Sequence, residues 1–76
     1  MKKNIYTIIG KNIKKYRKAN GLTQEQLALK TNLSYGFIKN LEAKSVRATI
    51  SIETLELIAE CLNVKIGNFF EDDYDN

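Results

Sequence analysis

Apolar residues recur every three or four positions along most of the chain, which is the spacing of one face of an α-helix. In the first segment these residues are Ile5, Ile8, Ile9, Ile13 and Tyr16. Asn4 precedes the segment and Asn20-Gly21 follows it, and such residues favour the start and the end of a helix. The pattern therefore predicts a helix from about Ile5 to Ala19, with lysines on its outer face.

The segment from Gln24 to Glu42 has the pattern of two short amphipathic helices joined by a tight turn. Thr23 and Gln26 form a capping-box pair at the start of the first helix, which we expect to end near Thr31. Asn32 tolerates the left-handed backbone that such a turn needs, and Ser34 can cap the second helix, from Tyr35 to Glu42 or Ala43. The inward positions are Leu27, Ala28, Leu33, Ile38 and Leu41. This arrangement is typical of a helix-turn-helix, whose second helix enters the major groove of DNA.

Two more helical segments follow a loop at residues 44–50. Ser51 is placed to cap a helix over Ile52–Leu62, and Ile66–Phe70 predicts a last short turn of helix. We therefore expect an all-α fold, a compact domain of five helices covering residues 1–70. The acidic tail, residues 71–76 with the sequence EDDYDN, is expected to be disordered.

Charge is distributed unevenly along the chain. Residues 1–50 contain eleven Lys or Arg and two acidic residues, whereas residues 51–76 contain one Lys and seven acidic residues. The first part thus carries a net charge of +9 and the second −6, within a total of +3. A basic region of this kind suits a polyanion, and together with the helix-turn-helix pattern it makes double-stranded DNA the favoured partner.

The sequence resembles the lambda-repressor/Cro-like helix-turn-helix family of small bacterial and phage transcription regulators. The residues that carry the resemblance are Ile13, Arg17, Gly21-Leu22-Thr23-Gln24, Leu27-Ala28, Leu33, Ile38, Leu41-Glu42, Leu55, Ile58-Ala59, Leu62 and Phe70. The end of the domain, from Ser51 to Phe69-Phe70-Glu71, is similar to controller proteins of restriction–modification systems. The resemblance implies a compact DNA-binding domain that regulates transcription, in a restriction–modification or a mobile-element operon.

The resemblance also implies an ion pair between Arg17 in the first helix and Glu42 at the end of the recognition helix. Such a pair would fix the angle of that helix; the alternative is two solvated charges. The start of the recognition helix should face base edges, and its candidate contacts are Ser34, Tyr35, Gly36, Lys39 and Asn40. Gly36 either permits close approach to the groove or is merely tolerated.

Phosphate contacts are expected at two places. Thr23 and Gln24 stand at the start of a helix, where free N–H groups and the helix dipole favour an anion, and the resemblance implies the contact of Gln24. Lys44 and Arg47 in the following loop, together with Lys39, are further candidates. The lysines of the first helix are expected to add only long-range attraction.

A domain of this size reads few base pairs, so we expect a homodimer on a two-fold operator with half-sites about 34 Å apart or a multiple of that distance. An exposed apolar patch often marks an interface. The residues that would form such a patch are Leu57, Cys61, Ile66 and Phe69.

Other functions are less well supported by the sequence. The chain has no histidine, no Gly-rich phosphate loop and no Cys/His cluster, so we expect no enzyme activity, no metal and no cofactor. No membrane segment, signal peptide or small-molecule site is evident, and a cytoplasmic location is expected. The alternative function is an antitoxin or anti-repressor that binds mainly a protein. Whether a regulator of this kind blocks RNA polymerase or contacts it stays open.

Overall fold

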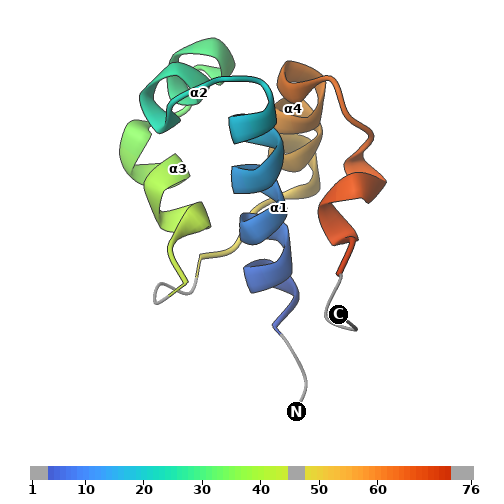
Figure 1. Ribbon diagram of the computed structural model, residues 1–76. Coiled ribbons are helices and arrows are strands. Elements are labelled where there is room, and N and C mark those ends of the chain that lie inside the picture. The colour runs from blue at the N-terminus through green and yellow to red at the C-terminus, as the bar shows by residue number, and fades with distance from the viewer. Residues whose placement is uncertain (1–3, 45–47, 73–76) are drawn as a thin grey trace.

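The structure is a computed structural model that describes residues 4–44 and 48–72 of the chain. Within these ranges it contains only helices, and their bounds are α1 (Ile5–Ala19), α2 (Gln24–Thr31), α3 (Tyr35–Glu42), α4 (Ile52–Leu62) and the 3-10 helix η1 (Ile66–Phe70). α1 runs through the middle of the fold, with α2 and α3 on one side and α4 and η1 on the other (Figure 1). The all-α class predicted from the sequence is confirmed.

The four α-helices begin and end where their capping residues predict. A side-chain oxygen accepts a backbone N–H at the start of each helix, and the capping residues are Asn4, Thr23, Ser34 and Ser51. α2 and α4 end at asparagines with left-handed backbone, Asn32 at φ 60° and Asn63 at φ 59°. After α1 the left-handed residue is Gly21, at φ 71°. These local signals fix the helix bounds because each cap bonds residues only a few positions away.

The fifth predicted helix is not an α-helix. Ile66–Phe70 forms a 3-10 helix, with backbone N–H groups bonded three residues back: Asn68 to the carbonyl of Lys65 at 2.9 Å, and Glu71 to that of Asn68 at 3.4 Å. Segments of three to five residues favour this tighter bonding, since α-helical bonds to the fourth residue have little length in which to form. The described chain thus has four α-helices and one 3-10 helix instead of five helices.

A single core holds the elements together. Its buried apolar members are Ile9, Ile13, Leu27, Ala28, Ile38, Leu41, Leu55, Ile58, Ala59, Leu62 and Phe69. Ile5 was expected on this face but is 45% exposed, because the first turn of α1 lies at the edge of the fold (Figure 1). Helices of 8 to 15 residues are marginal alone in water, so this shared core supplies most of their stability.

Gly10 sets how closely α1 approaches α3. A β-carbon built on Gly10 would overlap the carbonyl oxygen of Leu41 and would lie 3.7 Å from Cα of Glu42. The backbone of α1 therefore rests directly on the end of α3, and only glycine leaves room for this contact. The position of α3 depends on this glycine, which the sequence pattern did not single out.

The C-terminal segment is clamped onto α1 by polar side chains. Asn12 is 3% exposed, and its Nδ2 donates to the carbonyls of Phe69 at 2.9 Å and Glu71 at 2.7 Å. The hydroxyl of Tyr16 donates to Oε1 of Glu71 at 2.7 Å, and its ring packs edge-on against Phe69. Glu71 was assigned to the disordered tail, but these bonds include it in the folded domain. Residues 73–76 of that tail lie outside the described residues.

Candidate nucleic-acid interface

α3 has one buried and one exposed face. Ile38 and Leu41 are fully or nearly buried in the core, at 0% and 6% exposure, and Phe37 packs partly against it. The five predicted base-contacting residues all lie on the exposed side, and they are Ser34, Tyr35, Gly36, Lys39 and Asn40. The fold therefore presents these residues together on an outer surface of one helix, as groove recognition requires.

Three of these side chains, those of Ser34, Tyr35 and Lys39, are already organised by contacts within α3 and its N-cap. The ammonium group of Lys39 lies 5.8 Å from the centre of the Tyr35 ring, within the range of a cation–π contact. Ser34 caps the helix, since its Oγ accepts the N–H of Phe37 at 3.0 Å. The Ser34 hydroxyl can still donate a hydrogen bond, so capping and contact with a base acceptor are compatible.

Gly36, unlike Gly10, has no close neighbour that would exclude a side chain. A β-carbon at Gly36 would meet no atom within 4 Å, and the backbone there is ordinary helix. Packing within the protein therefore gives no reason for a glycine at this position.

Arg17 and Glu42 form the ion pair that the resemblance implies. Nε of Arg17 lies 2.7 Å from Oε2 of Glu42, and Nη2 donates to Oε1 at 2.9 Å, so the contact is bidentate. Both side chains are buried, with 8% and 2% of their surface exposed. A third donor, Nη1 of Arg17, bonds the carbonyl of Leu22 at 2.7 Å, in the segment that leads into α2. The pair therefore connects α1, the start of α2 and the end of α3.

Gln24 belongs to the same network. Its Nε2 donates to Oε1 of Glu42 at 3.0 Å, which ties the first residue of α2 to the last residue of α3. The predicted phosphate contact of Gln24 therefore has to use its backbone N–H or the second hydrogen of its amide. No local pattern of residues predicts this bond, because Gln24 and Glu42 belong to different helices.

Thr23 is fully engaged in the predicted capping box. Its Oγ1 accepts the N–H of Gln26 at 3.0 Å, and Oε1 of Gln26 accepts the N–H of Thr23 at 2.9 Å. The next N–H groups, those of Gln24 and Glu25, belong to the first turn of α2 and are directed out of the helix start. This end of the helix keeps the positive dipole that suits a phosphate, although the carboxylate of Glu25 opposes it.

The loop after α3 contributes one described candidate. Lys44 is exposed directly after the C-cap residue Ala43. Arg47, the other phosphate candidate of this loop, lies outside the described residues.

The predicted dimer patch needs one correction. Leu57 is 39% exposed, and Cys61 and Ile66 are partly exposed, but Phe69 is 0% exposed and belongs to the core. Phe69 turns inward because Asn12 bonds its carbonyl and Tyr16 packs against its ring. The neighbouring Phe70 is the exposed aromatic, at 41%. The pair of adjacent phenylalanines could not be oriented from the sequence, since the facing of η1 depends on contacts with α1.

Sequence reasoning also missed the role of Asn12 and the hydrogen bond from the Tyr16 hydroxyl to Glu71. A signal was present for Asn12, since a polar side chain beside Ile9 and Ile13 on a buried helix face requires hydrogen-bond partners. The hydrogen bond from Tyr16 is the main reason that the pKa of the Glu71 carboxyl group is lowered, and the hydrogen bond from Asn68 lowers it further. The same contact with Glu71 raises the pKa of the Tyr16 hydroxyl above its ordinary value of 10.0.

Within residues 4–44 and 48–72, no group of three or more His, Cys, Asp or Glu side chains is arranged to hold a metal ion. None of the described helices has the length and apolar character needed to cross a membrane.

Comparison with known proteins agrees with this geometry. A helix-turn-helix family model matches residues 13–69. The control protein C.SmaI of Serratia marcescens is 36% identical over 63 residues, which cover 83% of this chain and 73% of that protein. The immunity repressor of Bacillus phage phi105 is 40% identical over 59 residues, which cover 78% of this chain but only 40% of the repressor.

A solved structure shares the fold at a similar level of identity. A point mutant of the restriction–modification controller protein C.Esp1396I is 38% identical, with a TM-score of 0.77, and the match covers 92% of this chain and 86% of that one. The family and these relatives are DNA-binding regulators and not enzymes. The chain therefore belongs to the helix-turn-helix family of DNA-binding transcriptional regulators, as its resemblance to lambda-repressor/Cro-like proteins implies.

Proposed function

We propose that the chain binds a two-fold symmetric DNA operator as a homodimer and regulates a restriction–modification or mobile-element operon. The observation that carries the proposal is the division of α3 into a buried face, fixed by the core and by the Arg17–Glu42 pair, and an exposed face with Tyr35, Lys39 and Asn40. A helix held in this way can present side chains to base edges with a fixed angle. The similarity to C.SmaI and C.Esp1396I supports the restriction–modification operon.

The exposed residues of α3 would contribute to DNA binding in different ways. Asn40 can form two hydrogen bonds with adenine, a contact that discriminates against other bases by about 1–3 kcal/mol. Lys39 and Tyr35 can act as one unit, since their side chains are already in contact. Ser34 donates its hydroxyl, and Gly36 leaves room for the groove. With few long polar side chains on this face, part of the specificity is expected to come from DNA shape.

The dimer interface is proposed at the exposed side of α4 and η1. Leu57, Cys61 and Ile66 remain as its apolar residues after Phe69 is assigned to the core, and the exposed Phe70 is the last residue of η1. Dimer formation and operator occupancy would both rise with protein concentration, so the concentration of the protein is the simplest means of regulating its activity. Repression by blocking RNA polymerase and activation by contacting it are both compatible with this arrangement.

Selection from a random DNA duplex library tests the proposal. The bound fraction is isolated by gel shift at two salt concentrations and sequenced. We expect enrichment of a two-fold symmetric motif, with half-sites about 34 Å apart or a multiple of that distance, and affinity that falls as salt rises. Weak binding without an enriched motif would contradict the proposal and favour the alternative function of binding a protein partner.

A further inference from the structure

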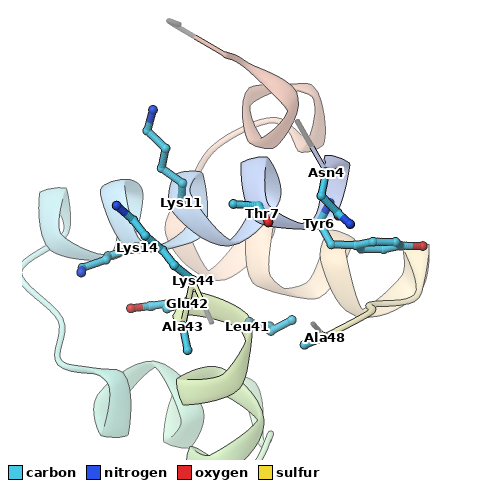
Figure 2. A pocket seen from close by; sticks show the side chains of 10 residues that line it. All are labelled: Asn4, Tyr6, Thr7, Lys11, Lys14, Leu41, Glu42, Ala43, Lys44 and Ala48. Atoms are coloured by element: carbon cyan, nitrogen blue, oxygen red, sulfur yellow. The ribbon is translucent and has the colours of Figure 1, made fainter. Parts of the chain in front are cut away.

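A cleft of about 570 Å³ lies between the first half of α1 and the end of α3 (Figure 2). Its wall on α1 includes Lys11 and Lys14, and its wall on the other side includes Glu42, Ala43 and Lys44. Figure 2 shows the three lysines gathered at one end of the cleft, whereas Tyr6 lies at the other end. We call the end with Lys11, Lys14 and Lys44 the lysine cleft. It joins residues that are far apart in the sequence.

The close contact of α1 with α3 creates this arrangement. Gly10 lets the backbone of α1 rest on Leu41, so the next residues of α1 on that side run beside the end of α3. Lys14 follows Gly10 by four residues and therefore lies on the same face of α1, one turn further along. Lys44 extends from the end of α3 into the same space. The backbone contact thus places lysines of α1 next to a candidate phosphate ligand of the interface.

The charge of the lysine cleft is strongly positive. Among the described residues that line it, the only acidic side chain is that of Glu42, and both oxygens of this carboxylate accept hydrogen bonds from Arg17. Gln24 donates a further bond to the same group. Because Glu42 is neutralised by a buried arginine, it offsets little of the charge of Lys14 and Lys44. Ammonium groups attract anions, and the anions that lie next to a DNA groove are the backbone phosphates.

The position of the cleft identifies the source of the phosphate. Glu42 lines the cleft and also accepts the bond from Gln24, so the start of α2 and the lysine cleft both border the end of α3. The start of α2 is already a candidate site for a phosphate of the DNA backbone. A duplex whose groove receives α3 would bring its backbone to both borders of that helix.

We propose that the lysine cleft binds a backbone phosphate of DNA, with Lys11 and Lys14 contributing directly beside Lys44. This inference rests on the proposed function and adds α1 to the DNA-binding surface. It assigns to Lys11 and Lys14 a contact in place of the long-range attraction expected from the sequence. The contact carries no sequence information, and it fixes how the protein is seated on the duplex.

The salt dependence of binding to a non-specific duplex tests this assignment. Each phosphate neutralised by the protein contributes about −0.9 to the slope of log affinity against log salt concentration. Lys14→Gln and the double variant Lys11→Gln/Lys14→Gln are expected to make the slope shallower by roughly that amount per protomer and per lost contact. Glutamine keeps the helix propensity of lysine, and circular dichroism checks that the variants remain folded.

Lys15→Gln is the matched control. It removes the same charge from the same helix, but Lys15 lies over the ring of Tyr16, 5.2 Å from its centre, on the side of α1 that faces the C-terminal segment. Under the proposal its slope stays close to that of the unmodified protein. Equal changes in the Lys14 and Lys15 variants would show that α1 acts only through long-range attraction, and would overturn the proposal.

The remaining outcomes separate this inference from the proposed function. If the unmodified protein binds duplex DNA with a steep salt slope and the Lys11 and Lys14 variants keep that slope, only the assignment of the cleft fails. If the unmodified protein shows no salt-dependent binding to DNA, the proposed function and the cleft assignment fail together. Calorimetry with inorganic phosphate tests whether the cleft instead binds a free phosphate ion. Binding that is lost in Lys14→Gln while the DNA slope is unchanged would also overturn the proposal.

Discussion

The hydroxyl of Tyr16 donates a hydrogen bond of 2.7 Å to Oε1 of Glu71, which joins the last turns of α1 to the residue that follows η1. Asn68 donates to the other oxygen of the same carboxylate at 3.0 Å. Both bonds favour the ionised carboxylate, so the pKa of Glu71 in the folded protein lies below its ordinary value of 4.5. The attachment of the C-terminal segment therefore depends on pH.

The first prediction concerns acid sensitivity. Because folding lowers the pKa of Glu71, its contribution to the free energy of unfolding is complete above the unfolded value near 4.5 and is lost as pH falls through the lower folded value. The pKa of Tyr16 is raised, so its contribution is lost only as pH rises above its ordinary value of 10.0. Between these limits the contact has its full effect on stability.

Urea unfolding of the unmodified protein and of Glu71→Gln, at pH 7 and at pH 3, measures this effect. We expect the variant to be less stable at pH 7 and the difference to shrink at pH 3, because the contribution of the Glu71 carboxylate declines as pH falls below 4.5. Tyr16→Phe keeps the ring on Phe69 and loses only the hydroxyl, so it should show the same trend. A difference between the proteins that is the same at both pH values would contradict the assignment.

The second prediction compares two glycines. Gly10→Ala should lower the free energy of unfolding by at least about 2 kcal/mol, since the new methyl group overlaps the backbone of α3. Gly36→Ala meets no neighbour and should be neutral or stabilise the protein by up to about 1 kcal/mol. Thermal or urea unfolding of the two variants provides the comparison, and equal effects would show that α1 and α3 are not in the contact described.

Gly36→Ala also tests the role of this residue on DNA. If the groove approaches the backbone of α3 at Gly36, the variant should fold normally and bind the selected operator more weakly, because the methyl group occupies that space. Titration of the operator with both proteins measures the change. Unchanged affinity would mean that glycine is merely tolerated at this position.

The third prediction concerns the buried ion pair. Glu42→Leu leaves Arg17 buried without its partner, which typically costs about 3–5 kcal/mol and would unfold much of a domain this small. The double variant Arg17→Met/Glu42→Leu removes both charges and should recover most of the stability. If the pair fixes the angle of α3, the double variant should nevertheless bind the operator about tenfold more weakly or worse, a loss near 1.4 kcal/mol. Full affinity of a folded double variant would restrict the pair to a structural role.

The fourth prediction concerns the oligomeric state. Leu57→Glu places a charge in the proposed apolar interface of α4, and we expect the dimer to dissociate in sedimentation velocity experiments. Leu29→Glu is the control, since Leu29 is 82% exposed on α2, outside the proposed interface. An unchanged dimer in the Leu57 variant would place the interface elsewhere. An unmodified protein that binds operator DNA as a monomer would contradict the dimer itself.

The helix bounds could be predicted because their signals are local. Thr23 and Ser34 bond N–H groups three residues away, and Asn32 and Asn63 adopt left-handed backbone that few other residues tolerate. The periodicity of apolar residues then identified the buried face of each α-helix. This information was sufficient for the recognition helix and for the side on which its candidate contacts lie.

The features that were missed depend on contacts between distant segments. The need for Gly10 arises only from the carbonyl of Leu41, and the inward position of Phe69 arises from Asn12 and Tyr16. The Gln24–Glu42 bond likewise joins residues on different helices. No pattern of neighbouring residues contains such relationships, so the dimer patch and the environment of Gln24 required the structure.

The two faces of α3 have a consequence for the evolution of this regulator. The core holds Ile38 and Leu41, whereas Tyr35, Lys39 and Asn40 lie on the exposed face. Substitutions at the exposed positions leave the core packing unchanged and therefore have little effect on stability. New target sequences can thus arise by exchanging a few outward residues, while the inward ones preserve the shape of the domain. Such a regulator can adapt to a changed operator, or be redesigned for another operator, through substitutions on the exposed face of α3 that leave its fold intact.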